Sequence, residues 1–189
     1  VVGVPLGVSA GMTRGWVSEL PLRLSDILYG FPALLLAILF AAALGGSTWT
    51  AMMAISLATI PAFVRIARAA TLQVMSQGYI EAARLSGTPT ATIAARHVLP
   101  NIAPVLGVQA SVSFGIAILA EAGLSYLGLG SGPDQPTWGR MLREAQDYLF
   151  SEPLLALWPG LAIAVATLGF NLLGDGLRDL LDPRLREVT

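Results

Sequence analysis

The chain contains no cysteine and no lysine, and it has a single histidine, His97. Without cysteine it has no disulfide and no thiolate metal ligand, and one histidine cannot form a histidine cluster around a metal ion. Without lysine it cannot hold a GxxxxGK[ST] phosphate loop, so it does not bind nucleotide in that way. The formal net charge of −1 gives no indication of nucleic-acid binding.

Charge is also scarce: 12% of the 189 residues are charged, whereas 54% are hydrophobic. A soluble domain has ~25% charged residues and needs that polar surface. The composition therefore predicts an integral membrane protein built as an all-α helix bundle. The run VVGVPLGVSAGM has no basic region before it, so we interpret residues 1–13 as the second half of a membrane helix and not as a signal peptide.

Long uncharged stretches predict the membrane spans. Residues 27–64 carry no charge and are too long for one crossing of a ~30 Å hydrocarbon core. The turn is predicted at Gly45-Gly46-Ser47-Thr48, with Trp49 after it as an interfacial anchor. The predicted spans are the partial span 1–13, then 27–45, 49–70, 98–121 and 153–174.

The remaining segments are more polar and are assigned to the two sides of the membrane. Residues 14–26 are predicted to be a polar loop, 126–153 an external loop with a surface helix at 138–150, and 175–189 a tail. If 14–26, 65–97 and the tail share one side, that side holds every arginine except Arg140 and Arg143. This is the positive-inside distribution, so that side is predicted to be cytoplasmic.

The longest stretch of this apolar chain that cannot sit comfortably in hydrocarbon is QGYIEAARLSGTPTATIAARHVLP, residues 77–100. Residues 79–86 are predicted to form a short helix that Gly87 ends by adopting a left-handed conformation. Thr88 is predicted to cap a second helix, with Pro89 in its first turn.

That second helix is predicted to run through Ala91, Ala94 and Ala95 to His97, and Pro100 to bend or end it. Two short helices at a fixed corner would form a rigid projection that another protein could push. A plain connecting loop is the alternative, since glycine and Thr-Pro corners are common.

Several blocks of the sequence resemble one family. Glu81-Ala82-Ala83, then Gly87, then Leu99-Pro100 are similar to the "EAA" signature of binding-protein-dependent ABC importer permeases, with His97 where that signature has isoleucine. HVLPN resembles the HILPN of dipeptide, oligopeptide and nickel permeases. Three further blocks resemble the same subfamily: LAEAGLSYLGLG (119–130), PTWGRML (136–142) and FNLLGDGLRDLLDPRLR (170–186).

The resemblance implies the type I importer transmembrane fold, with the first helix and part of the second missing from this chain. It implies a permease in the inner or plasma membrane of a prokaryote, without enzymatic activity of its own. Its segment 71–97 would couple to an ATPase through a coupling helix at about 79–86. The residues expected to take part in coupling are Tyr79, Ile80, Glu81, Ala82, Ala83, Arg84 and Gly87.

The implied partners are a second homologous permease, two cytoplasmic ATPase subunits, an extracytoplasmic solute-binding protein and membrane lipid. No cofactor is expected on this chain, because ATP and Mg would belong to the ATPases. The expected cargo is a di- or oligopeptide, with nickel, glutathione or oligosaccharide as alternatives.

Other polar residues are candidates for structural or gating roles. Glu121 lies at the outer end of a predicted span and is expected to cap the following loop, with a functional role as the alternative. Asn171 lies inside the last span, where a bond to a neighbouring helix is favoured over a contact with solute. Arg65 and Arg68 are interpreted as interfacial anchors, with gating or contact with an ATPase as the alternative. His97 is expected to be packed, although a pH-dependent role is the alternative.

Two other classes of membrane protein are alternatives to an importer permease. An ion-coupled secondary transporter would carry acids within its spans or paired broken helices, and the middles of these spans are uncharged. An exporter or channel-like protein would not need the long external loop. Co-purification with ATPase subunits would separate both from an importer permease.

Overall fold

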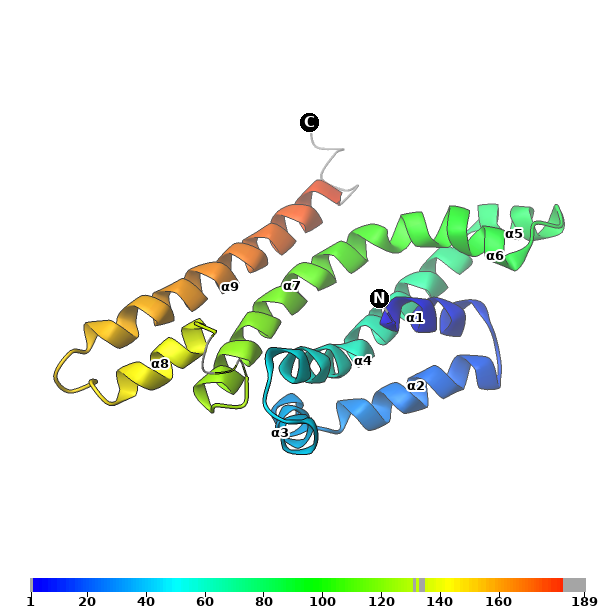
Figure 1. Cartoon of the computed structure of the whole chain (residues 1–189). Coiled ribbons are helices and arrows are strands. Elements are labelled where there is room, and N and C mark those ends of the chain that lie inside the picture. The colour runs from blue at the N-terminus through cyan, green and yellow to red at the C-terminus, as the bar shows by residue number, and fades with distance from the viewer. Residues whose placement is uncertain (1, 131, 133–134, 182–189) are drawn as a thin grey trace. The chain divides into compact units, whose positions relative to one another are not determined.

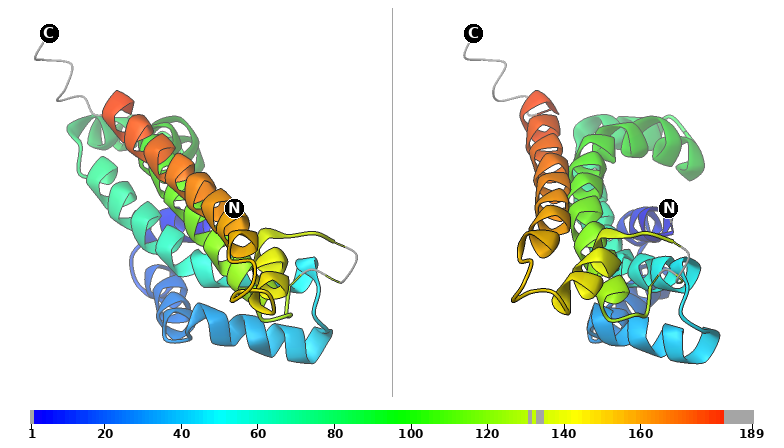
Figure 2. Two further views of the ribbon diagram at one scale, coloured as in Figure 1. Left: turned by 90° about the vertical axis from the view of Figure 1, so that its left-hand side faces the viewer. Right: turned by 60° about the vertical axis from the view of Figure 1, so that its left-hand side comes forward.

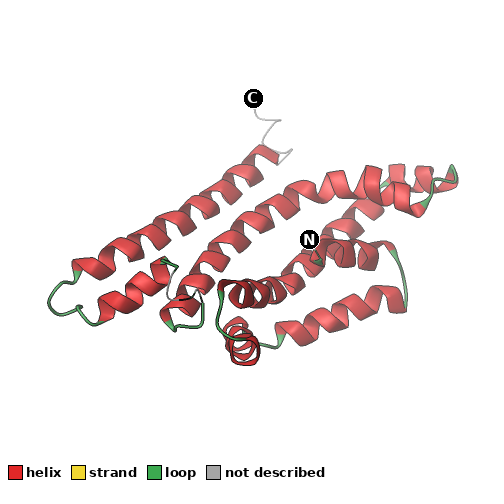
Figure 3. Ribbon diagram, viewed as in Figure 1, coloured by secondary structure: helices red, strands yellow, loops and turns green. Residues whose placement is uncertain are grey.

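The computed structural model describes residues 2–130, 132 and 135–181, so the end of the predicted tail lies outside the described residues. Every regular element in these ranges is helical, and Figure 3 shows no strand among them. In chain order the helices are α1 (Gly3–Met12), α2 (Trp16–Tyr29), α3 (Ala33–Leu44), α4 (Thr48–Met75), α5 (Gly78–Leu85), α6 (Thr90–Ile93), the π-helical turn η1 (Ala94–Val98), α7 (Leu99–Tyr126), α8 (Trp138–Gln146) and α9 (Leu154–Leu181).

The helices form two compact units. Among the described residues, the first unit comprises 2–30, 59–110 and 174–181, and the second comprises 31–58 and 111–173. Helices α4, α7 and α9 each run from one unit into the other. The first unit contains the predicted cytoplasmic segments, and the second contains the predicted external ones.

Among the residues that the structure describes, three helices are long and apolar enough to cross a membrane, namely Thr48–Met75, Thr90–Tyr126 and Leu154–Leu180. They contain nearly all of the last three predicted spans. α4 and α7 also extend beyond those spans, to Met75 and Tyr126, so the segments that follow them are shorter than predicted.

The prediction of one uninterrupted helix over 27–45 is wrong. α3 begins only at Ala33, and α2 and α3 are bent by 84° across the break between them. Pro32 causes the break because it lacks an N–H and disfavours helical geometry in Phe31 before it. The carbonyl of Pro32 then accepts a hydrogen bond from the amide of Leu36 (3.1 Å), which starts α3.

Residues 14–26 were predicted to be a polar loop, but most of them belong to α2. Their charges are spaced three and four residues apart and therefore share one side of a helix. Glu19 accepts a hydrogen bond from Arg23 (3.1 Å), and Asp26 accepts one from Arg65 of α4 (2.7 Å). The charges thus stabilise α2 through one pair within the helix and one pair with α4.

The external helix α8 is shorter than the predicted 138–150 and ends at Gln146. Its first turn is capped by Thr137, whose hydroxyl accepts a hydrogen bond from the amide of Arg140 (3.3 Å). The Tyr126 hydroxyl at the end of α7 donates to the Gln146 side chain (3.0 Å). Figure 2 shows α8 beside the end of α7, where this bond holds it.

Helix α1 packs against α4 through a glycine at every fourth position, Gly3, Gly7 and Gly11. A methyl group placed on Gly7 would lie 2.5 Å from the carbonyl oxygen of Val64, and one on Gly11 would lie 2.7 Å from Cβ of Thr71. Small residues at this spacing allow two membrane helices to approach closely. The glycines are therefore required by the contact, which no larger side chain would permit.

We expect Gly7→Ala to destabilise the protein by about 1–3 kcal/mol, because the added methyl overpacks the α1–α4 contact. The measurement is the thermal unfolding midpoint in detergent. Gly160→Ala in α9 is the matched control, since nothing lies within 4 Å of its added methyl. An unchanged midpoint for Gly7→Ala would contradict the observed packing.

Candidate functional site

Helices α5 and α6 form a hairpin at one end of the first unit (Figure 1). At its corner Gly87 has a φ of 75°. The amide of Gly87 donates to the carbonyl of Arg84 (3.0 Å), and the amide of Thr88 donates to that of Ala83 (3.1 Å). These two bonds are the Schellman ending of a helix, which favours glycine at this position. The prediction that Gly87 ends this helix in a left-handed conformation is confirmed.

The predicted capping role of Thr88 is wrong. α6 begins at Thr90, its N-cap residue is Pro89, and no side chain caps it. Thr88 belongs instead to the end of α5, because its amide completes the hydrogen bonding there. The turn between α5 and α6 is therefore one residue longer than predicted.

A cluster of aliphatic side chains holds the hairpin to the rest of the first unit. Ile80 is fully buried (0% exposed) and packs with Ile93, Val98 and Ile102, and with Val8 of α1. This corrects the expectation that Ile80 is available for coupling, because its side chain faces the core of its own unit. Ile80 anchors α5.

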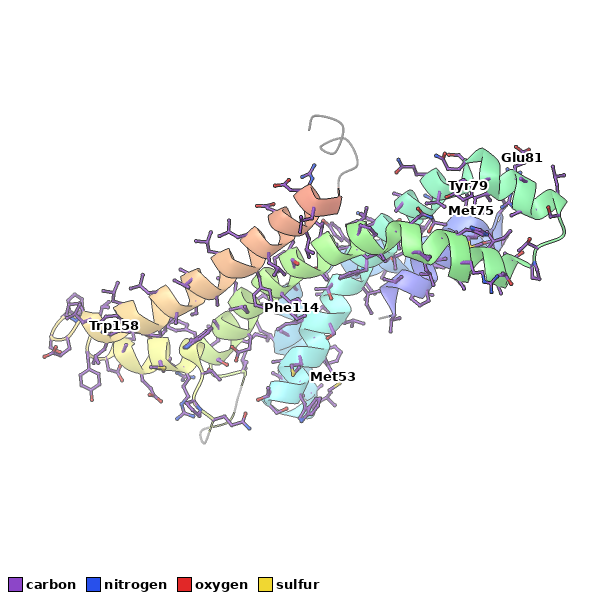
Figure 4. The ribbon with its side chains drawn as sticks, turned by 90° about the horizontal axis from the view of Figure 1, so that it is seen from above. Met53, Met75, Tyr79, Glu81, Phe114 and Trp158 are labelled. Atoms are coloured by element: carbon purple, nitrogen blue, oxygen red, sulfur yellow. The ribbon has the colours of Figure 1, made fainter. Side chains whose placement is uncertain are left out.

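The other side of α5 is open to solvent. Its exposed residues are Gly78, Tyr79, Glu81, Ala82, Arg84 and Leu85, and Ala83 is half-buried. Figure 4 shows Tyr79 and Glu81 on α5, with Met75 at the end of α4 near them. Leu85 is 86% exposed, although it is not among the residues predicted to take part in coupling. Its position four residues after Glu81 was the available signal, since this spacing places both on one side of a helix.

The hairpin continues directly into a long helix. Pro100 was predicted to bend or end the second helix, yet helix runs on through η1 into α7. A proline ring clashes with the carbonyl four residues earlier, here that of Arg96, and the wide π-helical turn relieves the clash. The side-chain amide of Asn101 donates to the carbonyl of His97 (2.6 Å), which adds a partner within the wide turn.

The ring of His97 also contacts the ring of Tyr79 on α5, with 5.9 Å between the ring centroids. His97 is half-buried. The contact favours the packed role over the pH-dependent one, and it links α5 to the start of the long helix.

The two arginines predicted to lie at the interface have different surroundings. Arg65 pairs with Asp26 (2.7 Å), and its guanidinium carbon lies 4.5 Å from the ring centroid of Tyr29. Among the described residues, Arg68 has a buried Nε atom without a hydrogen-bond partner. Arg65 therefore connects α4 to α2, whereas the role of Arg68 stays a prediction.

The acidic and amide candidates in the second unit make helix contacts. The carboxylate of Glu121 accepts a hydrogen bond from Ser125 one turn later in α7 (2.6 Å). Asn171 is exposed, and its Oδ1 lies 3.2 Å from where a methyl group on Gly115 of α7 would be. Both observations favour the structural role. Among the described residues, no three histidine, aspartate or glutamate side chains come together as metal ligands would.

Long apolar helices and a glycine-mediated contact between helices define a multi-pass membrane protein. The family model for the binding-protein-dependent transport system inner membrane component matches residues 3–187. The chain belongs to this family, which confirms the resemblance found in the sequence and the predicted membrane location.

Two curated relatives have similar sequences. The glutathione transport system permease protein GsiD of Pectobacterium atrosepticum is 42% identical over 186 residues, which cover 98% of this chain and 62% of that protein. The dipeptide transport system permease protein DppC of Alkalihalophilus pseudofirmus is 41% identical over 187 residues, covering 98% of this chain and 61% of that protein. The chain thus spans less than two thirds of their length.

A solved structure of the MetNI methionine ABC transporter, in an inward-facing conformation, has the same fold. The TM-score is 0.77 at 17% identity, and the match covers 96% of this chain and 86% of that one. The predicted all-α fold of a type I importer transmembrane domain is confirmed.

We expect Ile80→Ala to lower the free energy of local unfolding of the hairpin by about 2–5 kcal/mol, because it removes a fully buried side chain and leaves a cavity. Hydrogen exchange of the α5 and α6 amides should accelerate. Leu85→Ala is the matched control on the same helix, and as an exposed substitution it should change stability by less than about 0.5 kcal/mol. Equal protection in the two variants would show that Ile80 does not anchor the hairpin.

Proposed function

We propose that this protein is the pore-forming permease subunit of an ATP-driven ABC importer that carries di- or oligopeptides into a prokaryotic cell. The observation that carries the proposal is the α5–α6 hairpin, which exposes Glu81 and Leu85 while Ile80 fixes it from the other side. The names of the relatives support a peptide cargo, since one is a dipeptide permease and glutathione is a tripeptide.

The energy for transport would come from partner subunits. The chain has no lysine and hence no phosphate loop of the GxxxxGK[ST] type, so two cytoplasmic ATPases would hold ATP and Mg. A second, homologous permease would complete the pore, and an extracytoplasmic binding protein would deliver the solute. The family description, with its reference to binding protein and transport system, supports this set of partners.

Coupling would run through the exposed side of α5. ATPase closure can shift the pore between two conformations only if it contacts them differently. A hairpin whose corner is hydrogen-bonded and whose base is a buried aliphatic cluster moves as one piece, whereas a flexible loop would absorb the displacement. We propose that Leu85 enters an apolar pocket of the ATPase and that Glu81 and Arg84 make polar contacts around it.

Leu85→Ser is expected to lower the affinity of the permease for the ATPase by about tenfold or more, as for a central interface residue. Peptide-stimulated ATP hydrolysis by the assembled complex should fall with it. Ala91→Ser, an exposed change on α6, is the control and should leave both unchanged. Full ATPase binding and full coupling in Leu85→Ser would contradict the assignment of this side of α5.

Cargo and energy source are tested together in proteoliposomes that contain the full transporter and its binding protein. We expect uptake of a labelled dipeptide that requires ATP and persists when an ionophore dissipates ion gradients. Competition with unlabelled glutathione, nickel or an oligosaccharide identifies the cargo class among the alternatives. Uptake that depends on the ion gradient and does not require ATP would support a secondary transporter.

A further inference from the structure

Helix α2 has one exposed side made of large apolar residues. Trp16 is 89% exposed, which is unusual for tryptophan. At 3.6 residues per turn, the apolar side covers an arc of about 100° on the helix. Its residues are Trp16, Val17, Leu20, Leu24 and Ile27, all of them exposed.

The side of α2 that faces the protein has small residues instead. Ser18, Pro21 and Ser25 are buried. The Ser18 hydroxyl donates to the carbonyl of Ala10 in α1 (2.7 Å), and the Ser25 hydroxyl donates to that of Pro21 (2.7 Å). This side is packed, and its hydroxyl groups have partners.

The third side of α2 carries charges that pair within the first unit. Glu19 pairs with Arg23, and Asp26 pairs with Arg65, whose guanidinium lies over the ring of Tyr29. A helix with one apolar side and one charged side is typical of a helix at a membrane boundary. The apolar side of α2 is therefore suited to an apolar environment outside the protein core.

We propose that the apolar side of α2 contacts the acyl chains of lipids in the cytoplasmic leaflet. The size of its residues favours lipid over another helix, because protein contacts within membranes are enriched in small residues that allow close approach. The same chain shows this rule where α1 meets α4 through Gly7 and Gly11. The apolar side of α2 has no residue smaller than Val17.

The first residue of α2 and the charge near it are also suited to the boundary between lipid and water. Trp16 opens the helix on the predicted cytoplasmic side, and tryptophan is enriched at the boundary between lipid and water. Arg14 is exposed beside it, and its long side chain can reach anionic headgroups while the apolar side lies in the acyl region. This inference rests on the membrane family of the chain and is independent of cargo and of ATPase coupling.

Nitroxide labels at single cysteines test the proposal, since the chain has no cysteine that must first be removed. The variants are Leu20→Cys and Leu24→Cys on the apolar side, with Arg23→Cys on the charged side as the matched control. The full-length protein is labelled in the assembled transporter and placed in nanodiscs of phosphatidylethanolamine and phosphatidylglycerol. Electron paramagnetic resonance then compares collisions with oxygen, which dissolves in lipid, and with a nickel chelate, which stays in water.

We expect labels at 20 and 24 to collide mainly with oxygen and the label at 23 mainly with nickel, with oxygen-to-nickel ratios that differ several-fold. Labels at 20 and 24 that collide mainly with nickel would overturn the proposal, because that side would then face water. Labels that neither reagent reaches would also overturn it, since protein would cover the helix. Repeating the measurement on the permease alone then shows whether a partner subunit covers the apolar side of α2 in the assembled transporter.

Discussion

Ile80 lies in a cluster from which water is excluded, together with Ile93, Val98 and Val8. This contact fixes which side of α5 is turned outward, because a helix that buries one apolar residue completely cannot rotate without exposing it. Val8 reaches the cluster because the glycines of α1 allow that helix to lie against α4. The exposed side of the hairpin therefore depends on packing between segments that are distant in sequence.

Prolines have three different effects in this chain. Pro32 ends a helix, because the bend at this point separates α2 from α3. Pro100 stays within a helix, since the π-helical turn before it widens the backbone. Pro61 and Pro159 lie inside long membrane helices that continue past them. In a membrane, neighbouring groups and small adjustments satisfy the backbone carbonyl that a proline leaves free.

Side-chain size differs between the sides of the helices that pack against protein and the side of α2 that is open. The contact of α1 with α4 uses glycine, and the packed side of α2 uses serine and proline. Large side chains such as Leu20 and Leu24 are left on the open side of α2. In water the hydrophobic effect would bury them, but beside lipid that driving force is absent, and close packing decides which residues face protein.

The sequence by itself determined the membrane class, the family and the corner at Gly87, because these follow from composition, from short motifs and from the conformational freedom of one residue. Only the tertiary structure decided that residues 14–26 are mostly helical, since Asp26 pairs with an arginine 39 positions away. It likewise decided that Ile80 faces inward while Leu85 faces outward. Both residues are aliphatic and helix-compatible, so only the neighbours that other segments bring to Ile80 distinguish them.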